Sequence, residues 1–149
     1  MILKSLIWNL QDLFIFMDKY SDEDLAEISE HQWQLLTTSF KFNKPLEKIK
    51  AISELILKMD PHLIFLTEVG GLESLENFNH HFLNNSFDII HYPSNSDRGI
   101  DIAALVKRSL KIKSDFFNHH VFARGILRLE FKFNKNTYHF YHTHLKSKL

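Results

Sequence analysis

The sequence predicts an α/β (α+β) fold in which a mixed β-sheet carries helices on one face. Strand-like apolar runs alternate with amphipathic, helix-like segments over roughly the first 83 residues, and short strand-like runs alone follow from Phe87 onward. This order is typical of a mixed sheet with its helices on one side. The length of 149 residues and an apolar fraction of 44% suffice for one domain with a buried core.

The first elements are a strand and a predicted helical insertion. Residues 2–9 form a short, mostly apolar run that favours a buried strand. Ser21 is a suitable N-cap, and Asp24 stands three residues later, where a capping-box carboxylate belongs. We therefore expect a helix from Ser21 to about Leu36, within an insertion that covers about 12–40.

Two more helices and a central strand follow. Pro45 is a good first residue for a helix, and apolar side chains at three- and four-residue steps continue to Met59, before Asp60-Pro61. A strand over 63–68 and a weaker helix over 72–83 come next. The remaining predicted strands cover 87–92, 101–107, 110–117, 126–133 and 137–145.

The predicted strands are apolar on both faces, whereas the helices can cover only one face. The other face therefore needs a partner layer. We expect that layer to be either a second sheet absent from this chain or another copy of the molecule.

Composition limits the kinds of site and location. The chain has no cysteine, which excludes disulfides and thiolate metal sites. No apolar run is long enough to cross a bilayer, and the apolar N-terminal segment is interrupted by Asn9, Gln11 and Asp12, which is unlike a signal peptide. A cytoplasmic location is the default expectation.

Charge is unevenly distributed along a chain of zero net charge. Residues 1–97 hold 7 Lys and Arg against 15 Asp and Glu, whereas residues 98–149 hold 11 against 3. A basic C-terminal third suits a phosphate-bearing partner such as nucleic acid. Alternatively, the two halves neutralise each other across the folded surface.

Two polar residues end neighbouring predicted strands. Asn9 ends the first strand and Glu68 ends the next. Carboxylate and amide oxygens suit Mg²⁺, which proteins hold with few side chains plus water and phosphate. Each residue could alternatively be a turn former or a surface acid.

An acid and two histidines form a second candidate group. Asp101 opens an apolar strand and needs a polar partner, while His142 and His144 share one face of the last strand. A carboxylate that holds an imidazole suits acid–base work or phosphate stabilisation. The alternative is that both histidines are structural.

Three cations are candidate phosphate ligands. Arg124 precedes the strand at 126–133, Arg98 lies in a turn, and Lys146 follows His144 by two residues. Each could alternatively be a solvated surface charge.

Read in order, these segments resemble the endonuclease/exonuclease/phosphatase superfamily, which has the deoxyribonuclease-I-like fold. The resemblance lies in Leu6-Ile7-Trp8-Asn9, Leu66-Thr67-Glu68-Val69, the run from Asp97 to Ala103, and His142-Thr143-His144-Leu145-Lys146-Ser147. It implies half of a four-layer αββα sandwich. Thr67 stands where the family usually has Gln.

The resemblance also implies roles for individual residues. His144 is the active-site imidazole and Asp101 its carboxylate partner. Glu68 and Asn9 hold Mg²⁺ or Mn²⁺. Asn9 also has a catalytic role, because it holds the phosphate together with Arg124 and His144. The implied activity is that of a metal-dependent phosphoester hydrolase, of the nuclease or phosphodiesterase type. The substrate stays open between DNA, RNA, inositol phosphates and lipids, with a tilt toward DNA.

The chain departs from the family in length. Members continue to an Asp-x-Asn and a Ser-Asp-His segment, neither of which occurs here. We therefore expect residues 1–149 to be one partial domain whose C-terminal half is absent. We expect this partial domain to be inactive, or nearly so, by itself. The alternative is a non-enzymatic half-domain that dimerises, or binds a partner, through its uncovered sheet face.

Overall fold

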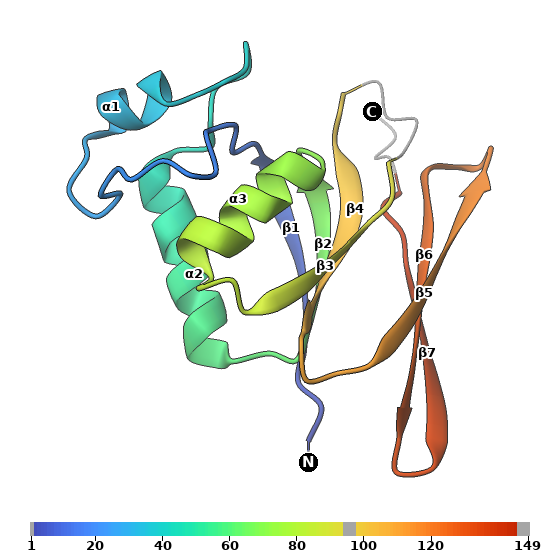
Figure 1. The fold of residues 1–149 in the computed structure, drawn as a ribbon. Coiled ribbons are helices and arrows are strands. Elements are labelled where there is room, and N and C mark those ends of the chain that lie inside the picture. The colour runs from blue at the N-terminus through green and yellow to red at the C-terminus, as the bar shows by residue number, and fades with distance from the viewer. Residues whose placement is uncertain (1, 94–97, 146–149) are drawn as a thin grey trace.

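The computed structural model describes residues 2–93 and 98–145 of the chain (Figure 1). The element order alternates strands and helices first and then continues with strands alone. The elements are β1 (Ser5–Leu13), α1 (Glu30–Leu35), α2 (Leu46–Met59), β2 (Leu63–Val69), α3 (Leu72–Phe82), β3 (Phe87–His91), β4 (Asp101–Lys107), β5 (Ile112–His119), β6 (Phe122–Phe133) and β7 (Asn136–His142).

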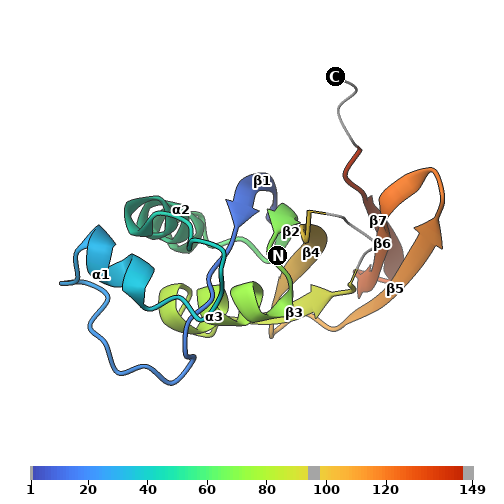
Figure 2. The ribbon, with the colours of Figure 1, turned by 90° about the horizontal axis from the view of Figure 1, so that it is seen from above.

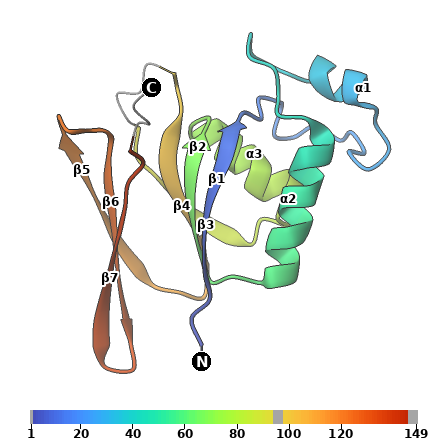
Figure 3. The same ribbon diagram turned by 180° about the vertical axis from the view of Figure 1, so that it is seen from behind.

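Sheet A is a four-stranded mixed sheet with the strand order β1-β2-β4-β3. β1 runs parallel to β2, and β4 runs antiparallel to both of its neighbours. Helices α2 and α3 lie on one face of this sheet (Figures 1 and 3). They bury Ile49, Ile56, Leu75 and Phe78 against it. The predicted mixed sheet with helices on one face is confirmed.

Sheet B is a three-stranded antiparallel sheet, β5-β6-β7, which packs on the other face of sheet A (Figure 2). Leu127 and Leu129 of β6 meet Phe65 of β2 in the core between the sheets. The expectation that this second layer is absent from the chain is therefore wrong. A run of strands has the same apolar pattern whether it extends one sheet or starts another, so the sequence could not separate the two cases.

Sheet B covers sheet A unevenly. The core between the sheets takes residues from β2 and β4. By contrast Ile7 of β1, on the face turned away from the helices, is 73% exposed. One edge of the second face thus remains bare, as the apolar pattern predicted for the whole face.

The segment between β1 and α2 contains less helix than predicted. Helix α1 begins only after Ser29, whose side chain forms a capping box with Gln32. Ser21 and Asp24 instead accept hydrogen bonds from backbone N–H groups two residues later. Such local turns compete with a helix, which explains why the predicted start at Ser21 fails.

Trp33 holds the short helix α1 to the core. Its indole is fully buried, and Nε1–H donates to the carbonyl of Lys44 at 2.9 Å.

No helix in the described part of the chain is both long and apolar enough to cross a membrane.

Candidate active site at the ends of the central strands

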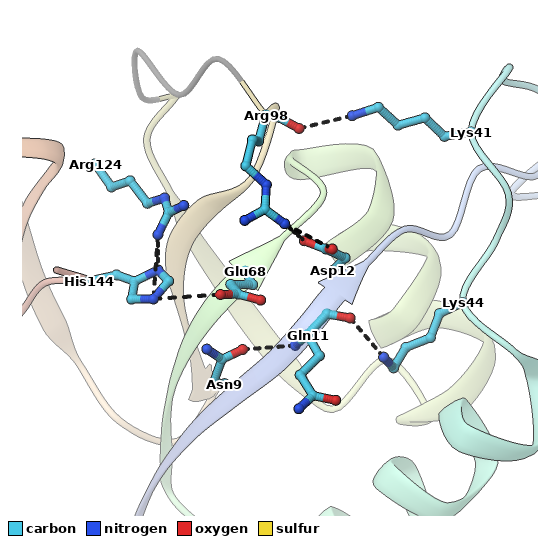
Figure 4. A network of polar contacts seen from close by, with 9 residues as sticks. All are labelled: Asn9, Gln11, Asp12, Lys41, Lys44, Glu68, Arg98, Arg124 and His144. Carbon is cyan, nitrogen blue, oxygen red and sulfur yellow. Dashed lines mark hydrogen bonds and ion pairs between the residues drawn. The ribbon is translucent and has the colours of Figure 1, made fainter. Parts of the chain in front are cut away.

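The carboxyl ends of β1 and β2 bring Asn9 and Glu68 onto neighbouring strands. Asn9 pairs in register with Thr67, the residue before Glu68. Figure 4 shows the two side chains near each other, with the drawn contact of Asn9 to Gln11 and that of Glu68 to His144. The side-chain oxygen of Asn9 also accepts a hydrogen bond of 2.8 Å from the Gln11 N–H, which fixes its orientation. The predicted proximity of the two strand ends is thus present.

Backbone irregularities on both strands shape this edge. Gln11, Asp12 and Glu68 all have positive φ angles, and the register shifts at the same places. A left-handed conformation costs a non-glycine residue roughly 1–2 kcal/mol. Bulges of this kind often re-aim a side chain beside a functional site.

The bulge at Glu68 redirects its carboxylate. Regular alternation would place Glu68 with Ile64 and Leu66, which face the helices. Instead Glu68 Oε1 lies 3.6 Å from Nε2 of His144, a residue that follows sheet B. The positive φ of 59° therefore explains why this acid faces sheet B.

His144 lies between a cation and an anion. The Nη1 group of Arg124 donates a hydrogen bond to Nδ1 of His144, which places the imidazole proton on Nε2, toward Glu68. Burial lowers the pKa of His144, and the nearby Arg124 lowers it further, against the opposing effect of Glu68. Burial and Arg124 together therefore favour the neutral imidazole.

Arg124 is deeply placed for a cation. The residue is 4% exposed, and its Nε is a buried donor without a hydrogen-bond partner among the described residues. A buried guanidinium with spare donors is a strong candidate for contact with an anion.

His142 has a structural position instead. Its ring is buried 5.3 Å from the ring of Phe65, and Nε2–H donates to the carbonyl of Leu66 at 2.9 Å. Burial lowers the pKa of His142. This hydrogen bond ties the end of β7 to β2, and thereby sets the distance between His144 and Glu68.

The predicted pairing of Asp101 with His144 is wrong. Among the described residues, Asp101 contacts Nε2 of His91 at 2.8 Å rather than His144. Alternation along β4 places Asp101 on the side of Ala103 and Leu105, which face the helices. His91, opposite Ala103 on β3, is its diagonal neighbour there.

The other two predicted cations differ in status. Arg98 is exposed, and its Nη2 contacts both carboxylate oxygens of Asp12 at 3.1 and 3.2 Å. It therefore lies beside the site and is held by an acid that the sequence reasoning did not select. Lys146 lies outside the described residues.

Lys44 is a member of the network that sequence reasoning missed. It is almost buried, and Nζ donates to the carbonyl of Gln11 at 2.9 Å. Burial is the largest cause that lowers its pKa. The position of Lys44 directly before Pro45, the predicted helix start, was the only hint in the sequence. Nothing in the sequence showed that the segment around Lys44 folds back onto β1.

The side-chain oxygens of Glu68 and Asn9 suit a hard divalent cation whose other ligands are water and substrate. The described residues contain no cluster of three or more His, Asp or Glu side chains arranged to hold a metal ion. Glu68 still offers its second oxygen, and an amide oxygen such as that of Asn9 has a second lone pair. One carboxylate plus one amide is a donor set that suits Mg²⁺.

Comparison with protein-family profiles matches residues 6–149 to the endonuclease/exonuclease/phosphatase family. The chain belongs to this family. The match covers both sheets and every residue of the network in Figure 4. A search of curated protein sequences finds no match.

Solved structures with a similar fold include TDP2 from Caenorhabditis elegans. The truncated form is 22% identical with a TM-score of 0.51, over 67% of this chain and 39% of that chain. The selenomethionine form is 23% identical and another TDP2 structure 22%, each with a TM-score of 0.51 over 67% of this chain and 30% of that chain. The likeness shows a deoxyribonuclease-I-like fold, and the chain spans well under half the length of these proteins.

Proposed function

We propose that the chain carries the metal- and phosphate-binding part of a phosphoester hydrolase of the nuclease or phosphodiesterase type. The observation that supports this most directly is the line from Arg124 through His144 to Glu68, beside Asn9. A buried cation, a neutral imidazole and a carboxylate lie together at the ends of central strands. Open α/β sheets commonly bind their ligands at such ends.

The chemistry divides between the two ends of this line. Glu68 and Asn9 would hold Mg²⁺ or Mn²⁺, which when bound polarises a phosphoryl oxygen. Arg124 supplies a positive charge, and its Nε–H has no hydrogen-bond partner among the described residues. Donors that are already oriented stabilise the negative charge that develops on a phosphate during hydrolysis.

His144 would act as a neutral donor rather than as an acid. Arg124 occupies Nδ1, so the proton on Nε2 is available to Glu68 or to a phosphate oxygen near it. Protonation of Nδ1 would break the contact with Arg124, and burial lowers the pKa of His144, which disfavours that protonation.

We infer that the 149 residues by themselves hydrolyse phosphoesters weakly or not at all. The sequence holds neither the Asp-x-Asn nor the Ser-Asp-His segment that the resemblance leads one to expect. Removal of a general base and its partner typically lowers rates by several powers of ten. Binding of metal and phosphate should nonetheless be measurable.

Metal binding tests the proposal without any need for turnover. Electron paramagnetic resonance of added Mn²⁺ should detect a site in the wild-type chain, and Glu68→Gln should weaken it about 10- to 100-fold. Glu54→Gln is the matched control, because Glu54 is an exposed acid on α2 that is not part of the network in Figure 4. Equal Mn²⁺ affinity in the wild type and Glu68→Gln would refute the proposed metal site.

Phosphoester hydrolysis is measured on the longest protein that the gene encodes. Mg²⁺-dependent hydrolysis of bis(4-nitrophenyl) phosphate should fall at least about a hundredfold in Glu68→Gln and in Arg124→Met, because each change removes charge stabilisation. Hydrolysis that survives both changes would count against this site.

A non-enzymatic role is the second candidate, and the bare edge of sheet A favours it. Ile7 on β1 is 73% exposed, and an apolar edge strand invites pairing with another chain. In this case the chain would dimerise through β1, and Ile7→Lys would abolish the dimer. Analytical ultracentrifugation that shows a wild-type monomer would rule out the dimer.

A further inference from the structure

A groove lies beside the candidate site, and the proposed hydrolysis does not use it. Its volume is about 430 Å³. We call it the Phe40 groove. Its lining residues are Gln11, Asp12, Phe14, the run from Phe40 to Pro45, and Lys48. The segment between α1 and α2 that forms one wall projects at the end of the molecule toward which β1 and β2 run (Figure 1).

Two phenyl rings of this wall stand in solvent. Phe40 is fully exposed and Phe42 is 79% exposed. Large apolar side chains that lie together at the surface, next to polar groups, often mark a binding site. The two rings flank Lys41, so they belong to one short segment.

Lys41 anchors that segment. Its Nζ donates to the carbonyl of Arg98 at 3.1 Å and lies 4.2 Å from the centre of the Phe14 ring. A segment held in this way presents its neighbouring rings at a lower cost in conformational entropy when a ligand binds.

The groove is positively charged within an acidic part of the chain. Lys41, Lys44 and Lys48 line it. The acid that lines it, Asp12, is already neutralised by Arg98. A groove with three lysines and two aromatic rings complements a ligand that has both negative charge and flat apolar faces.

The groove adjoins the candidate site through β1, because Gln11 and Asp12 line it. Asp12 follows Asn9 by three residues on β1, and Arg98 connects Asp12 to Lys41. Figure 4 shows Lys41 and Lys44 on one side of this connection and Glu68 with His144 on the other. A polymer bound at the candidate site would therefore extend toward the groove along this side of the molecule.

We propose that the Phe40 groove binds two unpaired nucleotides of a single-stranded nucleic acid, with one base stacked on Phe40 and one on Phe42. This inference rests on the proposed function and narrows its substrate class. Proteins that bind single strands combine cationic grooves with aromatic side chains, and a base exposes its flat face only when it is unpaired. A membrane surface fits less well, because stable membrane binding needs a larger apolar face or a polybasic patch.

The test measures fluorescence anisotropy of a labelled twelve-residue oligothymidylate with the wild-type chain and with Phe40→Ala/Phe42→Ala. Loss of base stacking should weaken binding by about tenfold for each ring. Tyr20→Ala is the matched control, since Tyr20 is an exposed aromatic between β1 and α1 that does not line the groove. A plot of log affinity against log salt concentration has a negative slope. Lys48→Gln should make this slope shallower by about 0.7, because one phosphate contact is lost.

Three outcomes would overturn the inference. The first is equal affinity of the double variant and the wild type. The second is equal binding of a blunt duplex and the single strand, both sensitive to the two rings. The third is binding of vesicles that contain 30% phosphatidylserine, with no binding of the oligonucleotide.

The metal assay separates this inference from the proposed function. Phe40→Ala/Phe42→Ala should keep wild-type Mn²⁺ affinity, which also shows that the variant is folded. Glu68→Gln, conversely, should lose Mn²⁺ while it keeps its affinity for the oligonucleotide in the absence of metal. Each proposal can therefore fail while the other stands.

Discussion

Gly125 provides a test of how tightly β5 and β6 pack behind the candidate site. It directly follows Arg124, and its φ angle of 70° lies in the left-handed region. A Cβ atom added there would lie within 2.9 Å of several ring atoms of Phe116. That ring stacks on Tyr92, with 5.2 Å between ring centroids, so it has little freedom to move away.

Gly125→Ala should therefore lower the free energy of unfolding through two effects. The left-handed backbone costs alanine about 1–2 kcal/mol. The overlap with Phe116 should add about 1–3 kcal/mol, which is typical of an overpacked core. Their sum, about 2–5 kcal/mol, corresponds to a drop in Tm of about 5–15 °C for a chain of this size.

Gly99→Ala is the matched control, because Gly99 has nearly the same φ angle, 65°, but among the described residues its added Cβ would meet no ring, and lies 3.1 Å from the side-chain end of Lys41. It should show the backbone cost alone. Urea denaturation followed by circular dichroism measures both variants. Equal destabilisation by the two variants, within 0.5 kcal/mol, would refute the steric argument. The argument would also be refuted if Gly125→Ala lowered the free energy of unfolding by the same amount in a Phe116→Leu variant as in the wild type.

Three further outcomes follow from the same structure. Ser29→Ala should destabilise the chain by about 1 kcal/mol through loss of the cap on α1, whereas Ser21→Ala should have an effect below about 0.5 kcal/mol in the same urea assay. Trp33→Phe should cost about 1–3 kcal/mol, because the buried carbonyl of Lys44 loses its donor; an unchanged urea midpoint would contradict this. Burial lowers the pKa of His142, so the unfolded chain takes up its proton first, and stability should fall as the pH drops from about 6.5 through the lower pKa of the folded state. His142→Gln should make that decline shallower, as followed by Tm against pH.

Local pattern predicted most of the elements. Helix α2 and strand β2 were expected almost at their observed bounds, because an amphipathic repeat after Pro45 and an apolar run after Pro61 are strong local signals. The helix expected from Ser21 was wrong, since side chains that cap a helix also form isolated turns. Capping residues identify a helix only when an apolar face behind them finds a place to pack.

The candidate site was predicted in part. Asn9 and Glu68 were expected side by side at neighbouring strand ends, and they do lie on paired strands. The roles assigned to Glu68, His144 and Arg124 remain predictions. The predicted partner of Asp101, His144, was wrong, since Asp101 contacts His91. The sequence does not show which residues from distant strands lie on the same face of a sheet.

The amino-acid sequence by itself determined the family, the order of the elements and the polar residues at the strand ends. These depend on local periodicity and on short segments that each carry their own signal. Only the tertiary structure decided that β5, β6 and β7 form a second sheet, that a bulge turns Glu68 toward His144, and that the segment around Phe40 lies beside the site. The physical reason is that an apolar strand or a loop lowers its free energy against any complementary surface, so its partner is set by the packing of the whole chain.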